Sequence, residues 1–181
     1  MQNSFLRIYD KPAKKMQETA AILGYIVIIM KNNPVHYSLP ISYLSKILLN
    51  ATLQKNIKIY FNSEGVPVGY VAWAYLDRMT EMRIMKTNNS NITTEEWNGG
   101  ESLWIMDFLS PHGNLNYILS NLRDEIFPHE KKIRYFRIKD GQKIYKEIVR
   151  NKKNNFFRAP SREFESCSCG KPDCPTFKQA V

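Results

Sequence analysis

The sequence predicts an α+β fold with a small, mostly antiparallel sheet flanked by helices. Residues 57–62, which alternate in polarity, and residues 66–76 are two strand-like runs around a short turn that contains Gly65, which is typical of a β-hairpin. Residues 103–109 are almost all strand-forming. The helical stretches stand around these strands rather than alternating strictly with them, which favours an α+β chain. The apolar or amphipathic helices are expected at residues 16–31, 41–56 and 115–127.

The first helix should end at Asn32-Asn33-Pro34, because the residue before a proline is pushed out of the α region. His36 follows this break at once, at a loop or helix start where a side chain can be presented rather than packed. A single histidine in such a place is usually exposed or hydrogen-bonded without any catalytic role. The second helix, after Pro40, then leads into the hairpin.

The second strand of the hairpin, residues 66–76, is apolar on both faces and should lie centrally in the sheet. Pro67 fits the start of that strand, where a missing backbone donor matters least. Gly69, inside the strand, predicts a bulge or a close approach of backbone or ligand.

The strand at residues 103–109 carries one ionisable side chain, Asp107. Strict alternation puts Asp107 on the face of Leu103, Ile105 and Leu109, and it puts the remaining side chains of the strand on the opposite face. Both faces are apolar, so the strand should be buried, and a carboxylate there needs a cation or good donors. Asp107 therefore either bonds to backbone N–H groups or an arginine, or orients a catalytic histidine from elsewhere in the chain.

The last part of the sheet is expected from residues 133–139 and 142–149, two strands joined by a turn at Asp140-Gly141. From residue 150 the composition shifts to Lys, Asn, Ser and Pro. We expect one domain over residues 1–149, with an N-terminal arm at 1–15, and a basic tail at 150–181.

Net charge and the lack of targeting signals indicate what kind of partner the protein binds and where in the cell it is expected. The chain has 26 Lys and Arg against 17 Asp and Glu, a net charge of +9, which predicts an acidic partner such as nucleic acid, an anionic membrane surface or an acidic carrier protein. The N-terminus lacks the basic-then-apolar order of a signal peptide, and the apolar run from Ala20 to Met30 is too short to span a bilayer. We therefore expect a cytoplasmic protein with no transmembrane segment.

Four motifs in order connect the chain to a known family. They are Asn-Pro-Val-His at 33–36, Pro-Val-Gly-Tyr-Val-Ala-Trp-Ala at 67–74, Glu-Glu-Trp-Asn-Gly-Gly at 95–100 and Trp-Ile-Met-Asp-Phe-Leu-Ser-Pro-His-Gly at 104–113. With these motifs the chain resembles the toxin-activating lysine acyltransferases that are encoded beside RTX toxins. The resemblance runs from about residue 23 to residue 149.

The resemblance implies a GNAT-like fold and transfer of a fatty acyl group from acyl carrier protein to internal lysines of an RTX protoxin. It implies His36 and Asp107 as the catalytic pair, no tightly bound cofactor, and acyl-acyl carrier protein as co-substrate. It leaves a homodimer open. Candidate contacts with donor or substrate are Gly69, Trp73, Arg134 and Arg137.

These residue types suit the implied chemistry. A lysine amine is mostly protonated at neutral pH and must lose a proton before it attacks a thioester. An imidazole can take that proton or carry the acyl group transiently, and a buried carboxylate can fix its tautomer. A backbone N–H beside Gly69 is a candidate donor to the thioester oxyanion.

The chain departs from the family pattern in three places. The aromatic-Pro sequence that commonly follows the histidine in the family is Ser38-Leu39-Pro40 here. Asn33 stands where the family often has serine, so any hydroxyl role is lost there. His112 stands where the family has phenylalanine, and it is either exposed or a competitor of His36 for Asp107.

Other readings of the chain are weaker. Cys167, Cys169 and Cys174 lie in the tail without a complete zinc-ligand spacing, so we expect no metal site and no disulfide framework. An acyl-coenzyme A-dependent N-acetyltransferase should carry a glycine-rich pyrophosphate loop before a helix, and none precedes residues 115–127. A nucleic-acid-binding module should carry basic and aromatic residues together, and Tyr135-Phe136-Arg137 is the one candidate. We expect no nucleic-acid partner.

Overall fold

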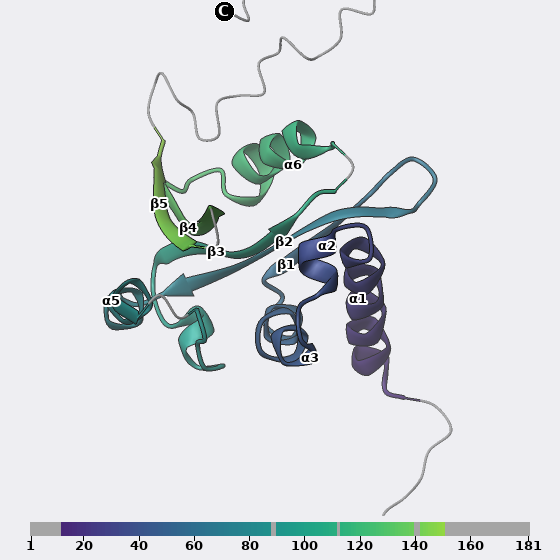
Figure 1. Cartoon of the computed structure of the whole chain (residues 1–181), viewed down its shortest axis with the longest axis horizontal. Coiled ribbons are helices and arrows are strands. Elements are labelled where there is room, and N and C mark those ends of the chain that lie inside the picture. The colour runs from purple at the N-terminus through teal and green to yellow at the C-terminus, as the bar shows by residue number, and fades with distance from the viewer. Residues whose placement is uncertain (1–11, 88–89, 112, 140–141, 151–181) are drawn as a thin grey trace, which may run out of the picture.

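A five-stranded sheet in the order β1-β2-β3-β4-β5 forms the centre of the protein, which we describe from a computed structural model (Figure 1). The structure describes residues 12–87, 90–111, 113–139 and 142–150. The predicted cysteine tail, His112 and most of the N-terminal arm lie outside these residues. The strands are β1 (Ile57–Phe61), β2 (Pro67–Leu76), β3 (Ser102–Leu109), β4 (Lys132–Lys139) and β5 (Gln142–Val149).

Helices cover both faces of the sheet (Figure 1). On one face, α1 (Lys14–Met30), α2 (Pro34–Tyr37), α3 (Ile41–Tyr43), η1 (Leu44–Leu48) and α4 (Leu49–Leu53) follow one another along the chain. On the other face lie α6 (Leu115–Asn121) and η3 (Leu122–Ile126). The remaining helical turns, α5 (Arg78–Thr87) and η2 (Glu96–Asn98), connect β2 to β3. The predicted α+β class with a mostly antiparallel sheet is confirmed.

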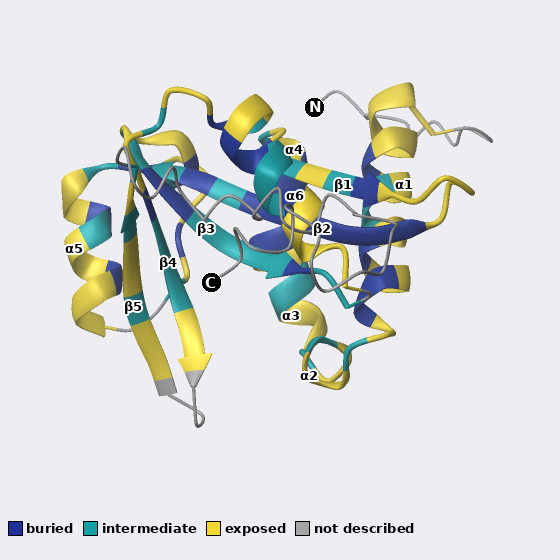
Figure 2. Ribbon diagram, turned by 90° about the horizontal axis from the view of Figure 1, so that it is seen from above, coloured by how far each residue is buried: buried dark blue, intermediate teal, exposed yellow. Residues whose placement is uncertain are grey.

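The two faces of the sheet bury separate apolar cores. The core under α1 contains Ile26, Leu48 and Trp97, and the core under α6 contains Ile118 and Phe127. β2 is buried along most of its length because it lies between β1 and β3 and is covered on both faces (Figure 2). This confirms the expectation that a strand apolar on both faces lies centrally.

The β1–β2 hairpin forms for local reasons as well as through its apolar pattern. The Asn62 side-chain oxygen accepts hydrogen bonds from the backbone N–H groups of Glu64 and Val66, and Gly65 adopts a φ of 76°. An Asn that bonds its own downstream backbone, followed by a glycine with positive φ, closes a tight turn at little steric cost.

β3 pairs antiparallel with β2 along its length, but its parallel pairing with β4 covers only Trp104 opposite Arg134 and Ile105 opposite Tyr135. Beyond Ile105 the two strands diverge, and the β4–β5 hairpin leans away from β3 (Figure 2). The C-terminal half of β3, which carries Asp107, is therefore held by β2 alone within the sheet.

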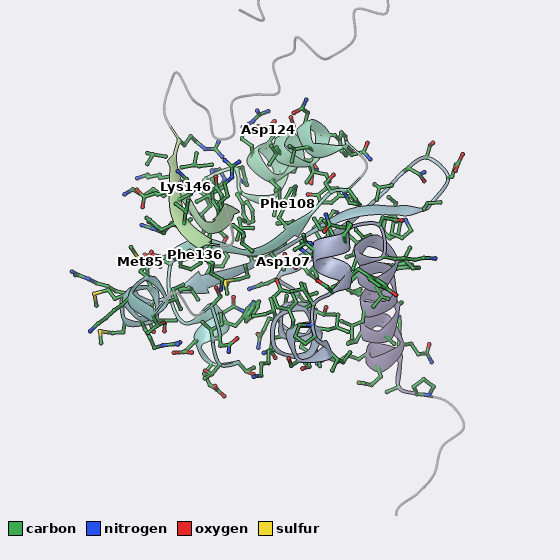
Figure 3. The ribbon with its side chains drawn as sticks, in the orientation of Figure 1. Met85, Asp107, Phe108, Asp124, Phe136 and Lys146 are labelled. Carbon is green, nitrogen blue, oxygen red and sulfur yellow. The ribbon has the colours of Figure 1, made fainter. Side chains whose placement is uncertain are left out.

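A β-bulge in β3 corrects the predicted orientation of Asp107. Trp73 pairs with Ile105 and Ala72 pairs with Asp107, so Met106 is the extra residue. The bulge reverses the alternation, and Asp107 lies on the face of α1 and α2, not on the face of Leu103 and Ile105 as strict period-2 alternation predicted. In Figure 3, Asp107 and its neighbour Phe108 lie on opposite sides of the strand, with Asp107 beside α2.

No helix in the described part of the chain combines the length and the apolar character needed to cross a membrane.

Candidate active site

A short helix places His36 at the site. Asn33 caps α2, and its side-chain oxygen accepts a hydrogen bond of 3.0 Å from the backbone N–H of His36, while Pro34 occupies the first helical position. Asparagine is a favoured N-cap residue, and proline suits the first turn because its missing N–H would have no partner there. The sequence Asn-Pro-Val-His thus encodes the direction in which the imidazole projects.

The imidazole of His36 meets Asp107 across the gap between α2 and β3. Its Nε2 lies 3.2 Å from Oδ1 of Asp107, and the two side chains are 18% and 8% exposed. The structure therefore brings together the two residues that the sequence predicts as a catalytic pair. Asp107 is held in this position by the Met106 bulge, which turns its side chain to the α2 face.

Asp107 has further donors besides His36. Oδ1 also accepts from the backbone N–H of Phe108 at 2.9 Å, and Oδ2 accepts from the hydroxyl of Tyr70 at 2.6 Å. The side chain of Tyr43 approaches the same carboxylate. These contacts supply hydrogen-bond partners to both oxygens of a mostly buried carboxylate, as burial of such a group requires.

The two tyrosines remain neutral donors. Burial, strengthened by the negative charge of Asp107 and a hydrogen bond to it, raises the pKa of Tyr70 well above its ordinary range. The same causes, burial first, raise the pKa of Tyr43. Their hydroxyl protons are therefore available to Asp107 at any physiological pH, and both groups fix the rotamer of the carboxylate.

Both ring nitrogens of His36 face oxygen acceptors. Nδ1 lies 3.2 Å from the Asn33 side-chain oxygen, whose identity is fixed because the same atom accepts from the backbone N–H of His36. A carboxylate on one side and an amide oxygen on the other can each accept an N–H, so the site is built to stabilise an imidazolium. Sequence reasoning assigned Asn33 only the loss of a hydroxyl, and it missed this contact.

Sequence reasoning also missed Tyr70 and Tyr43. Tyr70 stands inside the second motif and is completely buried, and a buried tyrosine usually has a hydrogen-bond partner for its hydroxyl. That rule could have indicated a polar partner, although not which one.

The other predicted contacts lie elsewhere. Trp73 is on the opposite face of the sheet, where it packs edge-to-face on Phe127 at 5.3 Å. Gly69 faces α6: a Cβ built there would lie 2.8 Å from Cδ1 of Ile118, which confirms a close approach. Trp73 therefore lies away from His36, and a side chain at Gly69 would point to α6 and not to His36.

The two predicted arginines differ from each other. Arg134 is 16% exposed, and its Nε lies 2.8 Å from Glu81 and 3.0 Å from Glu147. Arg137, on the same strand, is exposed. Arg134 is thus engaged in ion pairs within the fold, whereas Arg137 is presented to solvent.

No group of three or more potential metal ligands gathers among the described residues. The three cysteines of the tail lie outside them.

Comparison with known proteins identifies the family of the chain. The model of the RTX toxin acyltransferase family matches residues 15–150. Protein sll0720 of Synechocystis is 30% identical over 138 residues, which cover 75% of this chain and 92% of that protein. The RTX-II toxin-activating lysine-acyltransferase ApxIIC of Actinobacillus pleuropneumoniae is 30% identical over 109 residues, 60% of this chain and 66% of that enzyme. The protein-lysine palmitoyltransferase CyaC of Bordetella bronchiseptica is 34% identical over 91 residues, 50% of this chain and 48% of that enzyme. The match therefore spans about two thirds or less of these two enzymes.

Because the family model covers the whole region from α1 to the end of β5, including His36 and Asp107, the chain belongs to the RTX toxin acyltransferase family.

Proposed function

We propose that this protein transfers a fatty acyl group from acyl carrier protein to lysine ε-amino groups of an RTX protoxin, with His36 as general base oriented by Asp107. The observation that carries the proposal is the 3.2 Å contact between His36 and Asp107 at a partly open site. Two relatives are named as a toxin-activating lysine-acyltransferase and a protein-lysine palmitoyltransferase, which supports lysine as acceptor and a fatty acid as the transferred group.

The two ring nitrogens of His36 take different parts. The carboxylate of Asp107 is the stronger acceptor, so in the neutral imidazole the proton stays at Nε2 and the lone pair is on Nδ1. When Nδ1 takes a proton, the Asn33 oxygen accepts it as a hydrogen bond, and Asp107 offsets the new positive charge. This is the Asp-His part of the Ser-His-Asp arrangement without its serine.

A single base, His36, can move the proton that the reaction transfers. The lysine nitrogen bonds to the acyl carbon, the carbon–sulfur bond breaks, and His36 takes the proton from the amine and returns it to the departing thiolate. In a two-step variant, a ring nitrogen of His36 first bonds to the acyl carbon as the carbon–sulfur bond breaks and the carrier thiolate leaves. The lysine nitrogen then bonds to the same carbon, the bond to the imidazole breaks, and the amine proton goes to the released imidazole. An enzyme-bound acyl group at His36, found by mass spectrometry of the quenched protein without acceptor, would identify the two-step route.

The donor is inferred from charge. A net charge of +9 suits an acidic carrier protein, because complementary charge speeds and orients docking. A coenzyme A thioester is the alternative donor, and nucleic-acid binding is the alternative reason for the charge. Nucleic-acid binding gives no reason for a buried Asp107 beside His36, whereas a coenzyme A thioester would use the same pair.

The role of His36 is tested by comparing His36→Ala with His129→Ala in acylation of a protoxin followed by intact mass. His129 is an exposed histidine in the turn after η3, so it is a control of the same residue type away from the site. We expect His36→Ala to lose acyl transfer with an unchanged melting temperature and His129→Ala to keep both. Undiminished acylation by His36→Ala would refute its catalytic role.

The donor is tested by measuring rates with palmitoyl-acyl carrier protein and palmitoyl-coenzyme A at rising salt. We expect the carrier-bound donor to be faster and its advantage to shrink with salt, because screening weakens exposed charge contacts. Equal, salt-independent rates with both donors would favour coenzyme A.

A further inference from the structure

A pocket of about 410 Å³ opens next to His36, between the C-terminal half of α1, α2 and the start of α3. His36 is one of the residues that line it. Its volume lies within the range of about 300–1,000 Å³ that is usual for small-molecule sites. The pocket is therefore large enough for a ligand and is continuous with the candidate catalytic base.

The rest of the wall is mainly hydrocarbon. It is lined by apolar side chains of α1, the α2–α3 connection and the helix that follows: Val27, Ile28, Met30, Leu39, Ile41 and Leu44. Lys31 is the one lining residue with a permanent charge among the described residues of this pocket. A wall of this kind favours an apolar guest, because each methylene group taken from water adds to its affinity.

Several of the residues that line the pocket are apolar and exposed to solvent. Val27 is 52% exposed, Ile28 49%, Tyr37 72% and Ile41 78%. Single exposed apolar residues are ordinary, but a contiguous group around a hollow marks a binding surface. In Figure 2, α2 and α3 lie at the border of the molecule, largely coloured as exposed.

We propose that this pocket holds the hydrocarbon chain of the acyl donor, with the thioester carbon beside His36. The inference rests on the proposed acyl transfer. It adds where the hydrocarbon chain of the donor binds and which residues limit the length of that hydrocarbon chain. Three observations favour this occupant: the apolar wall, the catalytic histidine within that wall, and a relative named as a palmitoyltransferase. Ile41 and Val27 would then limit the chain length that the enzyme accepts.

The first test measures binding without catalysis. A palmitic acid with a photoreactive diazirine is crosslinked to the full chain, and labelled peptides are identified by mass spectrometry. We expect labelling within residues 27–31 and 36–44, suppressed by unlabelled palmitate and lost in Ile41→Trp, whose indole fills the opening. Met79→Trp is the matched control, since Met79 is 73% exposed but lies on α5.

The second test measures chain-length preference. We expect Ile41→Trp to lower the ratio of kcat/KM for palmitoyl over octanoyl donors by at least about tenfold, because a filled pocket rejects added methylene groups, with no such change in Met79→Trp. Val27→Trp should act in the same direction from the facing helix. Both substituted residues are exposed, so the fold tolerates the larger ring.

The outcomes separate the pocket from the proposed function. If the probe labels the pocket but the protein acylates no protoxin, the assignment of the pocket would hold and the proposed acyl transfer would be refuted. Labelling elsewhere, or an unchanged palmitoyl-to-octanoyl ratio in Ile41→Trp, would overturn the pocket assignment. Light scattering that shows a dimer dissociated by Ile41→Trp, with an unchanged ratio, would also overturn it, because a second copy of the chain would then cover this face.

Discussion

His36 and Asp107 stand 71 residues apart in the chain, yet Nε2 of the one lies 3.2 Å from Oδ1 of the other. The contact depends on a capped turn of helix on one side and on a bulged strand on the other. Substitutions can therefore separate the chemistry of the pair from the structures that position it.

Asp107→Asn should strongly reduce acyl transfer. An amide at this position can donate to Nε2 and favour the wrong tautomer, and it cannot offset an imidazolium charge. We expect kcat/KM to fall at least about a hundredfold, given the roughly 10⁴-fold loss for the equivalent protease substitution. The rate is measured together with the melting temperature. A variant that folds normally and keeps more than about a tenth of the activity, a loss of about 1.4 kcal/mol or less, would show that Asp107 is only structural.

Tyr70→Phe removes the 2.6 Å hydrogen bond to Asp107 and keeps the buried ring. A hydrogen bond to a charged group contributes about 1.5–3 kcal/mol, so we expect a loss of stability in that range and a reduced kcat from a less ordered carboxylate. Tyr60→Phe is the matched control, because its hydroxyl donates to Asn121 at 3.0 Å in the other core. Denaturant unfolding and kcat are measured for both. Equal activity of the two variants would argue against a positioning role for Tyr70.

Gly69→Ala should destabilise the fold by about 1–3 kcal/mol, the usual cost of overpacking. The new methyl group would lie 2.8 Å from Cδ1 of Ile118 and 3.0 Å from the carbonyl oxygen of Leu109. Gly24→Ala, in the middle of α1 with open space around the added Cβ, should instead stabilise by about 0.5–1 kcal/mol. Urea unfolding of the two variants measures the contrast. A Gly69→Ala protein with full stability but impaired acyl transfer would point back to the oxyanion role.

Arg134 and Arg137 should respond differently to the same change. Arg134→Gln leaves Glu81 and Glu147 without their shared cation, and we expect a loss of about 1–3 kcal/mol in unfolding free energy. Arg137→Gln should leave the melting temperature unchanged and raise KM for the carrier-bound donor at low salt. Calorimetry and donor titrations distinguish the two. Stability that falls equally in both variants would contradict this assignment.

The fold class, most element positions and the partnership of His36 with Asp107 could be predicted from sequence. Apolar periodicity specifies which segments are buried, and the order of the four motifs indicated the family. The orientation of Asp107 could not be predicted, because a bulge adds one residue without any signature in the strand. The convergence of Tyr43 and Tyr70 on Asp107 also escaped prediction, since periodicity says which face a residue takes but not which hydroxyl meets which carboxylate.

The asparagine cap was within reach of sequence reasoning. Asn33 before Pro34 is a recognisable start of a helix, and capping would have placed the backbone of His36 directly above the asparagine side chain. The ion pairs of Arg134 could not be predicted from the sequence, because Glu81 lies on a helix whose position against β4 depends on tertiary packing.

The bulge at Met106 makes the site depend on the pairing of β3 with β2 more than on the identity of the extra residue. A different apolar side chain at Met106 would keep the bulge and leave Asp107 opposite Ala72, facing α2. If Met106 instead paired regularly with Ala72, Asp107 would stand opposite Val71 and its carboxylate would turn into the core beneath α6, away from His36. In this protein, a one-residue slip of β3 against β2 would therefore separate the catalytic pair as surely as replacing either of its members.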